Sequence, residues 1–238
     1  YFFADPVSVP EDERKHYAEK VYDLPCIITY EPPTEYNILG SSPLPLHHNE
    51  YITFGTYARY EKLSDQCLAT FNEILKRVST AKLQFKDHGF RRPYSIRRVL
   101  QAMKDIAPER LLFSIATNHQ EHLQTYQQAD IILDPFPHTG GVVGLEQLWM
   151  GVPVVTLYGT QASGRSTSAV LTAMGRTDWI AKTREQYVDI AVALSGDVPQ
   201  LVKARKSLRD ELLSSPVVSG YVDKVEEAYR VMFDRWAG

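Results

Sequence analysis

The chain has 238 residues, of which 44% are hydrophobic and 23% are charged, and its formal net charge at pH 7 is -3. This length is sufficient for one sizeable α/β domain, or for one domain and part of another. The small negative charge gives no basis for binding nucleic acid or an anionic membrane, and no apolar run approaches the roughly 20 residues that span a bilayer.

We find no signal peptide, and two cysteines are too few for a disulfide framework or a metal cluster. Cys26 and Cys67 are therefore interpreted as reduced thiols, which indicates a cytoplasmic protein. The chain begins without a methionine, at what reads as the end of a strand over residues 1–6. We interpret it as a piece of a longer protein.

The first 48 residues are rich in proline and have little regular pattern. Only residues 11–21 have a helical pattern, since the prolines elsewhere in this segment favour extended or loop structure. This composition is typical of a linker or of the edge of a preceding domain. We therefore assign residues 1–48 to the end of a preceding domain and a linker.

From residue 49 onward, short apolar strands alternate with helical segments. Strands are expected at residues 52–55, 83–85, 111–114, 131–133, 153–157 and 179–181. Helices are expected from an N-cap at Ser64 through residue 75, and at residues 95–104, 120–127, 145–149, 166–174, 184–194, 198–213 and 221–236. This alternation predicts an α/β fold with a doubly wound, Rossmann-like parallel sheet over residues 49–216.

The most informative stretch follows the strand at residues 131–133. Gly140 and Gly141 come first, then Glu146, and Pro153 begins the next strand, so that loop, helix, turn and strand stand in register. Glycines at the carboxyl end of a parallel strand let the backbone approach a ligand, and the next helix offers free N–H groups to phosphate. The stretch predicts a diphosphate site with Glu146 beside a ribose. A glycine turn without a ligand remains the alternative.

Lys62, His119, His122 and Arg165 are further candidates. Lys62 follows the first strand of the domain and faces the same crevice, although taken alone it is better explained as a surface lysine. His119 and His122 share one helix face, which fits a platform for a nucleotide base, a solvated pair, or a metal pair without a third ligand. Arg165 precedes a helix and could reach a phosphate. We find no Ser-His-Asp set, Walker loop or dinucleotide fingerprint.

The ordered set of these residues resembles the catalytic region of the O-GlcNAc transferase family, whose members are inverting glycosyltransferases of the GT-B fold. The resemblance covers nearly the whole chain. The ordered set of matching stretches is specific to the family, although no single motif is decisive. The matching stretches are residues 1–25, 54–62, 74–78, 113–114, 121–122, 134–151, 180–182, 189–191 and 215–216. The resemblance implies the donor-binding, C-terminal half of a protein glycosyltransferase.

The resemblance also implies roles for individual residues. Lys62 would bind the donor phosphates and stabilise the leaving group, while His122 would pack on the base. Glu146 would hold the ribose, and Arg59 would contact the nucleotide. Many members have His-Thr-Thr where this chain has Gly141-Val142-Val143, so the helix N–H groups remain but two hydroxyl contacts to phosphate are missing.

The implied reaction passes a sugar from a nucleotide sugar such as UDP-GlcNAc, with inversion, to Ser, Thr or Asn of a protein or peptide. Lys62, Arg165 and the helix dipole would stabilise the diphosphate, so no metal or other cofactor is expected. The opening at residues 134–137 is closer to the Spindly-type branch, which uses GDP-fucose. UDP-GlcNAc, UDP-glucose and GDP-fucose therefore stay open, as does a non-catalytic nucleotide-sensing or scaffold module.

In the family an acceptor-side domain precedes this region, commonly after tetratricopeptide repeats. The final helix, within residues 217–238, resembles the one that packs back across the cleft between the two halves. We therefore expect the parent chain to supply that domain and those repeats. The isolated chain is expected to bind nucleotide weakly and to leave transfer uncatalysed.

Overall fold

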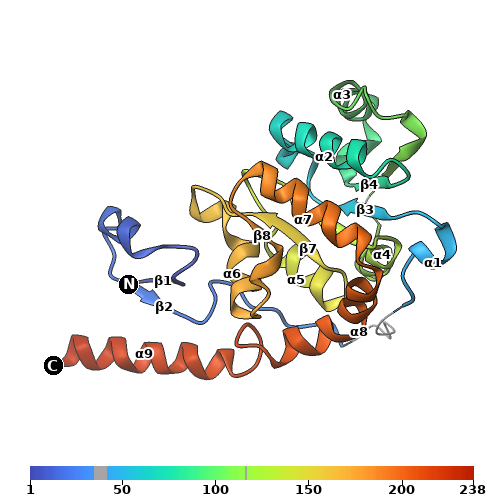
Figure 1. The fold of residues 1–238 in the computed structure, drawn as a ribbon. Helices are drawn as coiled ribbons and strands as arrows, with labels where there is room; N and C mark the ends of the chain where they lie inside the picture. Colours follow the sequence, from blue (N-terminus) through green and yellow to red (C-terminus); the bar gives the residue numbers. More distant parts are fainter. Residues whose placement is uncertain (35–41, 116) are drawn as a thin grey trace.

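The structure, a computed structural model, describes residues 1–34, 42–115 and 117–238 (Figure 1). Six parallel strands form the main sheet in the order β5-β4-β3-β6-β7-β8. Their bounds are β3 (Thr53–Thr56), β4 (Lys82–Lys86), β5 (Leu111–Ser114), β6 (Ile131–Leu133), β7 (Val154–Leu157) and β8 (Ile180–Ala181). The chain runs outward from β3 to β5, returns to β6 beside β3, and then runs outward to β8. The predicted doubly wound fold is confirmed.

Helices connect the strands, and the right-handed crossovers of such an order place them on both faces of the sheet. Helix α2 packs against α3 and α7, whereas α5 packs against α6 and α8. The bounds are α1 (Leu46–Asn49), α2 (Asp65–Arg77), α3 (Pro93–Ala102), α4 (His119–Thr125), α5 (Val142–Trp149), α6 (Ser166–Ala173), α7 (Arg184–Gly196), α8 (Val198–Ser214) and α9 (Tyr221–Ala237). The predicted helices from residue 64 onward are all present, with ends shifted by up to three residues.

Strand β6 is apolar along its length because both of its faces are covered. Ile131, Ile132 and Leu133 are at most 1% exposed. Such runs are typical of strands in parallel sheets. Helix α2 begins as predicted at Ser64, whose Oγ accepts a hydrogen bond of 3.1 Å from the N–H of Cys67. The strands thus hold the loops that follow their carboxyl ends in fixed positions.

The predicted helix at residues 11–21 is wrong. The structure has a 3-10 helix, η1 (Glu11–His16), with no buried residue, and then a strand, β2 (Val21–Asp23). Strand β2 pairs in parallel with β1 (Phe2–Ala4) in a separate two-stranded sheet. An exposed segment has no apolar face to stabilise an α-helix. The N–H and C=O groups after it pair with β1 instead. The short helix α1 also lies in a segment that we expected to be a loop.

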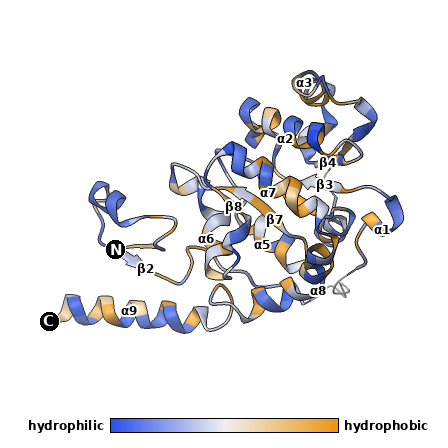
Figure 2. Cartoon of the chain, in the orientation of Figure 1, coloured by the Kyte–Doolittle hydropathy of each residue, from blue (hydrophilic) through white to orange (hydrophobic). Residues whose placement is uncertain are grey.

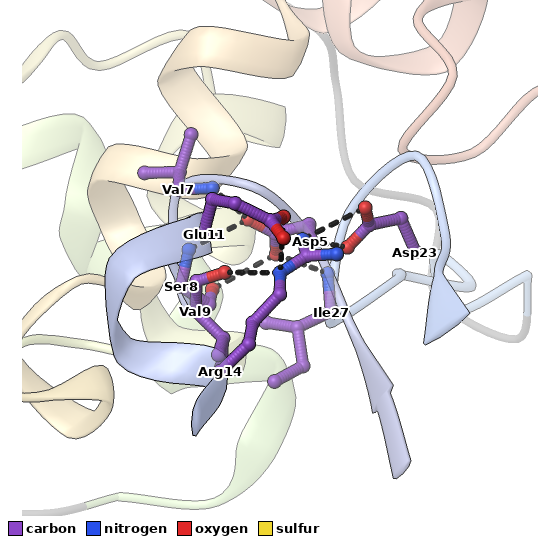
Figure 3. A network of polar contacts seen from close by, with 8 residues as sticks. All are labelled: Asp5, Val7, Ser8, Val9, Glu11, Arg14, Asp23 and Ile27. Atoms are coloured by element: carbon purple, nitrogen blue, oxygen red, sulfur yellow. Dashed lines mark hydrogen bonds and ion pairs between the residues drawn. The ribbon is translucent and has the colours of Figure 1, made fainter. Parts of the chain in front are cut away.

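Polar contacts hold the N-terminal segment together, and Figure 3 shows the network around Asp5. The Asp5 carboxylate accepts hydrogen bonds from the N–H groups of Val7, Ser8 and Ile27 at 2.7 to 2.9 Å. Arg14 donates to both carboxylate oxygens of Asp23 at 2.7 and 2.8 Å. These contacts fix the turn after β1 against the chain that leaves β2.

The linker that follows is attached to the main domain. Cys26, Tyr30 and Leu44 belong to the hydrophobic core cluster of the six-stranded domain. The Asp130 carboxylate, just before β6, accepts hydrogen bonds from the N–H groups of Leu46 and Thr53 at 3.1 and 2.8 Å. The linker therefore lies against the same domain that carries the predicted site.

Helix α9 extends away from the six-stranded domain and runs past β1 and β2 (Figure 1). The Tyr229 ring contacts Phe3 with 5.5 Å between ring centroids, and the Tyr221 hydroxyl donates to the Cys26 carbonyl at 3.0 Å. Apolar and polar residues alternate along α9 (Figure 2), and Phe233 and Trp236 are exposed. In the described part of the chain no helix is both long and apolar enough to cross a membrane.

Candidate functional site

A cavity of about 290 Å³ lies where the strand order reverses, at the carboxyl ends of β3, β4 and β6. Open parallel sheets bind their ligands at such a position. We call it the first cavity. Of the residues predicted from the sequence, Arg59, Lys62, His122 and Gly140 line it. The other residues that line it are Tyr57, Ala58, Lys86, Asp87, Ile132, Leu133, Asp134, Pro135, Val143 and Gln147.

Lys62 ends a short 3-10 helix, η2 (Tyr60–Lys62), that follows β3. Its Nζ donates a hydrogen bond of 2.6 Å to the carbonyl oxygen of Thr139. Burial lowers the pKa of Lys62, while the nearby Asp134 opposes that shift. The hydrogen bond uses one of the three N–H donors and holds the ammonium group beside the loop before α5.

The buried Asp134 side chain holds that loop through hydrogen bonds. The side chain is 2% exposed, and its two oxygens accept hydrogen bonds of 2.8 Å from the Gly140 N–H and the Thr156 hydroxyl. Burial raises the pKa of Asp134, and both hydrogen bonds oppose that shift. A Cβ atom at Gly140 would lie 3.1 Å from Asp134 Oδ1, a tight contact that a larger residue could make only if Asp134 moved by a few tenths of an ångström. A Cβ atom at Gly141 would meet nothing within 4 Å.

Helix α5 begins directly after these glycines, with Gly141 at its N-cap position and no side chain capping it. The first N–H groups of a helix have no partner within the helix, and they stand at the positive end of its dipole. Val142 and Val143 carry two of these groups. Helix α5 begins where the loop at residues 134–141 ends, and Lys62 and Val143 both line the first cavity, so the helix start and Lys62 can contact one anionic group.

Glu146 lies at the centre of a buried polar network. Its Oε2 accepts a hydrogen bond of 3.0 Å from the Tyr126 hydroxyl, and its Oε1 lies 3.1 Å from His119 Nε2. His122 Nε2 lies 2.7 Å from the same Tyr126 hydroxyl oxygen. Burial lowers the pKa of His122 to about 4, with smaller effects of Lys86 and His119. A neutral His122 protonated on Nε2 donates to Tyr126, which in turn donates to Glu146.

Glu146 and Val142 face a second cavity of about 570 Å³, which His119 and residues 29–34 of the linker also line. Val143 and Gln147, each one position further along α5, face the first cavity instead. The predicted site residues are therefore divided between two neighbouring cavities along the start of α5. A ligand that contacts both Lys62 and Glu146 has to extend along this helix.

Arg165 lies in neither cavity. Its guanidinium donates to both carboxylate oxygens of Glu13 and to the carbonyl oxygens of three residues, Ser8, Gly159 and Thr160. The predicted contact of Arg165 with a phosphate would require these bonds to break. Sequence reasoning missed this pairing because Glu13 comes from the distant N-terminal segment.

Several residues at the site were not predicted. Tyr126 lies four positions after His122, so helical spacing could have placed both on one face. Lys86 is the last residue of β4, and the rule that ligands bind at carboxyl ends of strands could have identified it. In the described ranges no group of three or more His, Cys, Asp or Glu side chains is placed to hold a metal ion. Instead, the Nε2 atoms of His119 and His122 both lie within 4 Å of the Glu146 carboxylate, at 3.1 and 3.7 Å.

The sequence of this chain is similar to those of known proteins. A sequence profile of glycosyl transferase family 41 matches residues 33–224. The Arabidopsis thaliana protein named "Probable UDP-N-acetylglucosamine--peptide N-acetylglucosaminyltransferase SPINDLY" is 32% identical over 243 residues, covering 99% of the chain and 26% of that protein. The chain thus spans about a quarter of the length of the plant relatives that it matches.

Solved structures agree with the sequence match. A mutant O-GlcNAc transferase from Thermobaculum terrenum superimposes with a TM-score of 0.86 and 31% identity, over 97% of this chain and 44% of that one. A sucrose-phosphate synthase from Thermosynechococcus elongatus superimposes with a TM-score of 0.66 over 98% of this chain and 58% of its own, at 12% identity. The latter likeness concerns the fold alone.

Proposed function

The chain belongs to glycosyl transferase family 41, and we propose that it is the donor-binding half of a protein glycosyltransferase. The observation that carries this proposal is the position of Lys62, whose Nζ is held 2.6 Å from Thr139 O beside the start of α5. An ammonium group and free helix N–H groups that converge on one loop suit a diphosphate.

In this proposal the donor lies along the start of α5. Lys62 and the N–H groups of Val142 and Val143 contact the diphosphate, and Glu146 accepts hydrogen bonds from the ribose hydroxyls. His122 lies against the base, and Arg59, which lines the same cavity, contacts the nucleotide. The charge that develops on the leaving diphosphate in the transition state is stabilised by groups already in place. That role requires no metal ion.

We propose UDP-GlcNAc as the donor, since the Arabidopsis relative is named for this substrate. The sugar would pass with inversion to a Ser, Thr or Asn side chain of a protein. The acceptor would be bound by an N-terminal half that precedes this chain in the parent protein. Tetratricopeptide repeats would also precede this chain there. The limited length of this chain relative to its relatives supports that arrangement.

Calorimetric titration of the chain with UDP and GDP tests the donor site. We expect Lys62→Ala to weaken nucleotide binding about 10- to 100-fold, because it removes a charge-assisted contact of roughly 1.5–3 kcal/mol. The matched control is Lys104→Ala, which removes an exposed lysine in the turn after α3. Equal affinities for wild type and Lys62→Ala would contradict the assignment of the diphosphate to this position.

The valines at the start of α5 favour a second function, that of a nucleotide-sensing module without turnover. They leave backbone N–H groups but no hydroxyls for phosphate. Incubating the whole protein and a protein acceptor with labelled UDP-GlcNAc, UDP-glucose and GDP-fucose separates the two functions. Transfer from any donor supports the enzyme, and the labelled sugar identifies the donor. Nucleotide binding without transfer from any of the three supports the sensing module.

A further inference from the structure

Lys86, the last residue of β4, lines the first cavity and has no role in the proposed function so far. The residue is 2% exposed. Its Nζ donates hydrogen bonds to the hydroxyls of Thr117 and Thr125, at 3.1 and 2.8 Å. No ion pair joins it to a carboxylate within the ranges that the structure describes. Burial lowers the pKa of Lys86.

A buried ammonium group that forms no ion pair is uncommon, since buried charges are usually paired. The Glu121 carboxylate opposes the lowering of the Lys86 pKa, but no ion pair joins the two among the described residues. Thr125 ends α4, and the negative end of the helix dipole gives Lys86 partial compensation. Two hydroxyl acceptors satisfy two of the three N–H donors of an ammonium group. One donor is left for a further acceptor, and the open space next to Lys86 is the first cavity.

The position of Lys86 relative to His122 indicates which part of a ligand it would meet. Thr125 Oγ1, which accepts from Lys86, donates a hydrogen bond of 2.6 Å to the His122 carbonyl oxygen. The side chains of Lys86 and His122 both line the first cavity, together with Tyr57. Lys62 and the start of α5 occupy the diphosphate end in the proposed function. Lys86 therefore stands with His122 at the end assigned to the base.

We propose that Lys86 reads the nucleobase by donating an N–H to a carbonyl oxygen on it, O4 of uracil or O6 of guanine. Cytosine and adenine carry an amino group at that position, and an amino group cannot accept this hydrogen bond. The site then selects donors with an oxo base and rejects those with an amino base. This inference rests on the proposed function, because it needs a nucleotide in the first cavity.

Titrating the chain calorimetrically with UDP, CDP, GDP and ADP tests the inference. Wild type should bind UDP at least tenfold more tightly than CDP, or GDP at least tenfold more tightly than ADP, because the wrong base leaves a buried donor unpaired. Lys86→Met should reduce that ratio to less than twofold, and Lys86→Arg, which keeps N–H donors, should restore part of it. The matched control is Lys82→Met, at the opposite end of β4.

The outcomes separate this inference from the function on which it rests. If wild type binds CDP as tightly as UDP, and ADP as tightly as GDP, the inference is overturned and no variant is needed. The inference is also overturned if Lys86→Met lowers the affinity for every nucleotide by the same factor, because Lys86 would then only hold α4 in place. Wild type that binds none of the four nucleotides overturns the proposed function and this inference with it.

Discussion

At the scale of single residues, hydrogen bonds between side chains organise the site. Glu146 is held by Tyr126 at 3.0 Å, and Tyr126 is held in turn by His122 at 2.7 Å. Such a network holds the carboxylate in one position, which the proposed function assigns to contact with the ribose. The two glycines before it differ in role. A side chain at Gly140 would press against Asp134, whereas the space around Gly141 would accept one.

The buried His122 makes stability depend on pH. Its pKa in the folded protein is about 4, below the ordinary value of 6.5, so between these values the unfolded chain binds more protons. The free energy of unfolding should therefore fall as the pH drops from about 6.5 to 4, by up to ~3 kcal/mol from this residue. Urea unfolding of wild type and His122→Gln at several pH values measures the difference.

The control for that experiment is His48→Gln, which removes an exposed histidine. It should follow wild type across the whole pH range, whereas the stability of His122→Gln should fall less steeply below pH 6.5. Parallel curves for wild type and His122→Gln would mean that His122 is solvated in both states.

At the scale of elements, one hydroxyl joins α2 to the loop that holds the site. Ser64 caps α2 by accepting from Cys67 N–H, and it donates a hydrogen bond of 2.8 Å to the carbonyl oxygen of Phe136. Lys62, two positions earlier, contacts Thr139 in the same loop. The helix start, η2 and the loop at residues 134–141 therefore form one connected unit.

Replacing Ser64 by alanine should destabilise the fold by about 2 kcal/mol, since it removes an N-cap of about 1 kcal/mol and a second hydrogen bond of similar strength. The midpoint of urea unfolding measures the loss. Ser79→Ala, at an exposed position after α2, is the matched control and should stay within about 0.5 kcal/mol of wild type. A Ser64→Ala protein as stable as wild type would show that neither bond contributes.

At the scale of the whole molecule, the N-terminal segment is joined to the six-stranded domain through Arg165. This buried guanidinium binds both oxygens of Glu13 and also the Ser8 carbonyl, while the Tyr158 hydroxyl donates to Val7 O at 3.2 Å. These contacts are made just before α6, away from the first cavity. They give Arg165 a role in attaching residues 1–27 to the rest of the chain.

Glu13→Gln should loosen that attachment without unfolding the domain. The neutral amide keeps at most one acceptor for the guanidinium, so about 1–3 kcal/mol of local stability should be lost. Hydrogen exchange should then become faster for residues 1–27 and stay unchanged in β6 and β7. Glu19→Gln is the exposed control. Unchanged exchange in the N-terminal segment would leave the Glu13–Arg165 pair without a measurable role.

Much of the fold follows from the sequence because its signals are local. The apolar strands, the cap at Ser64 and the order of the strand–helix units were all predicted, since period and capping depend on neighbouring residues. The helix predicted at residues 11–21 failed because the chain from Val21 onward pairs with β1, a contact that no local pattern reports. Arg165 faces the N-terminal segment for the same kind of reason.

The sequence by itself determined the doubly wound sheet, the loop at Gly140 and Gly141, and the family. Tertiary structure alone decided how the candidate residues group. It places Lys62 and His122 in one cavity and Glu146 in the next, and it adds Lys86 and Tyr126, which come from different elements. The physical reason is that hydrophobic period and turn chemistry act along the chain. Cavities form where strand ends meet, and the strand order of the folded sheet determines which ends are neighbours.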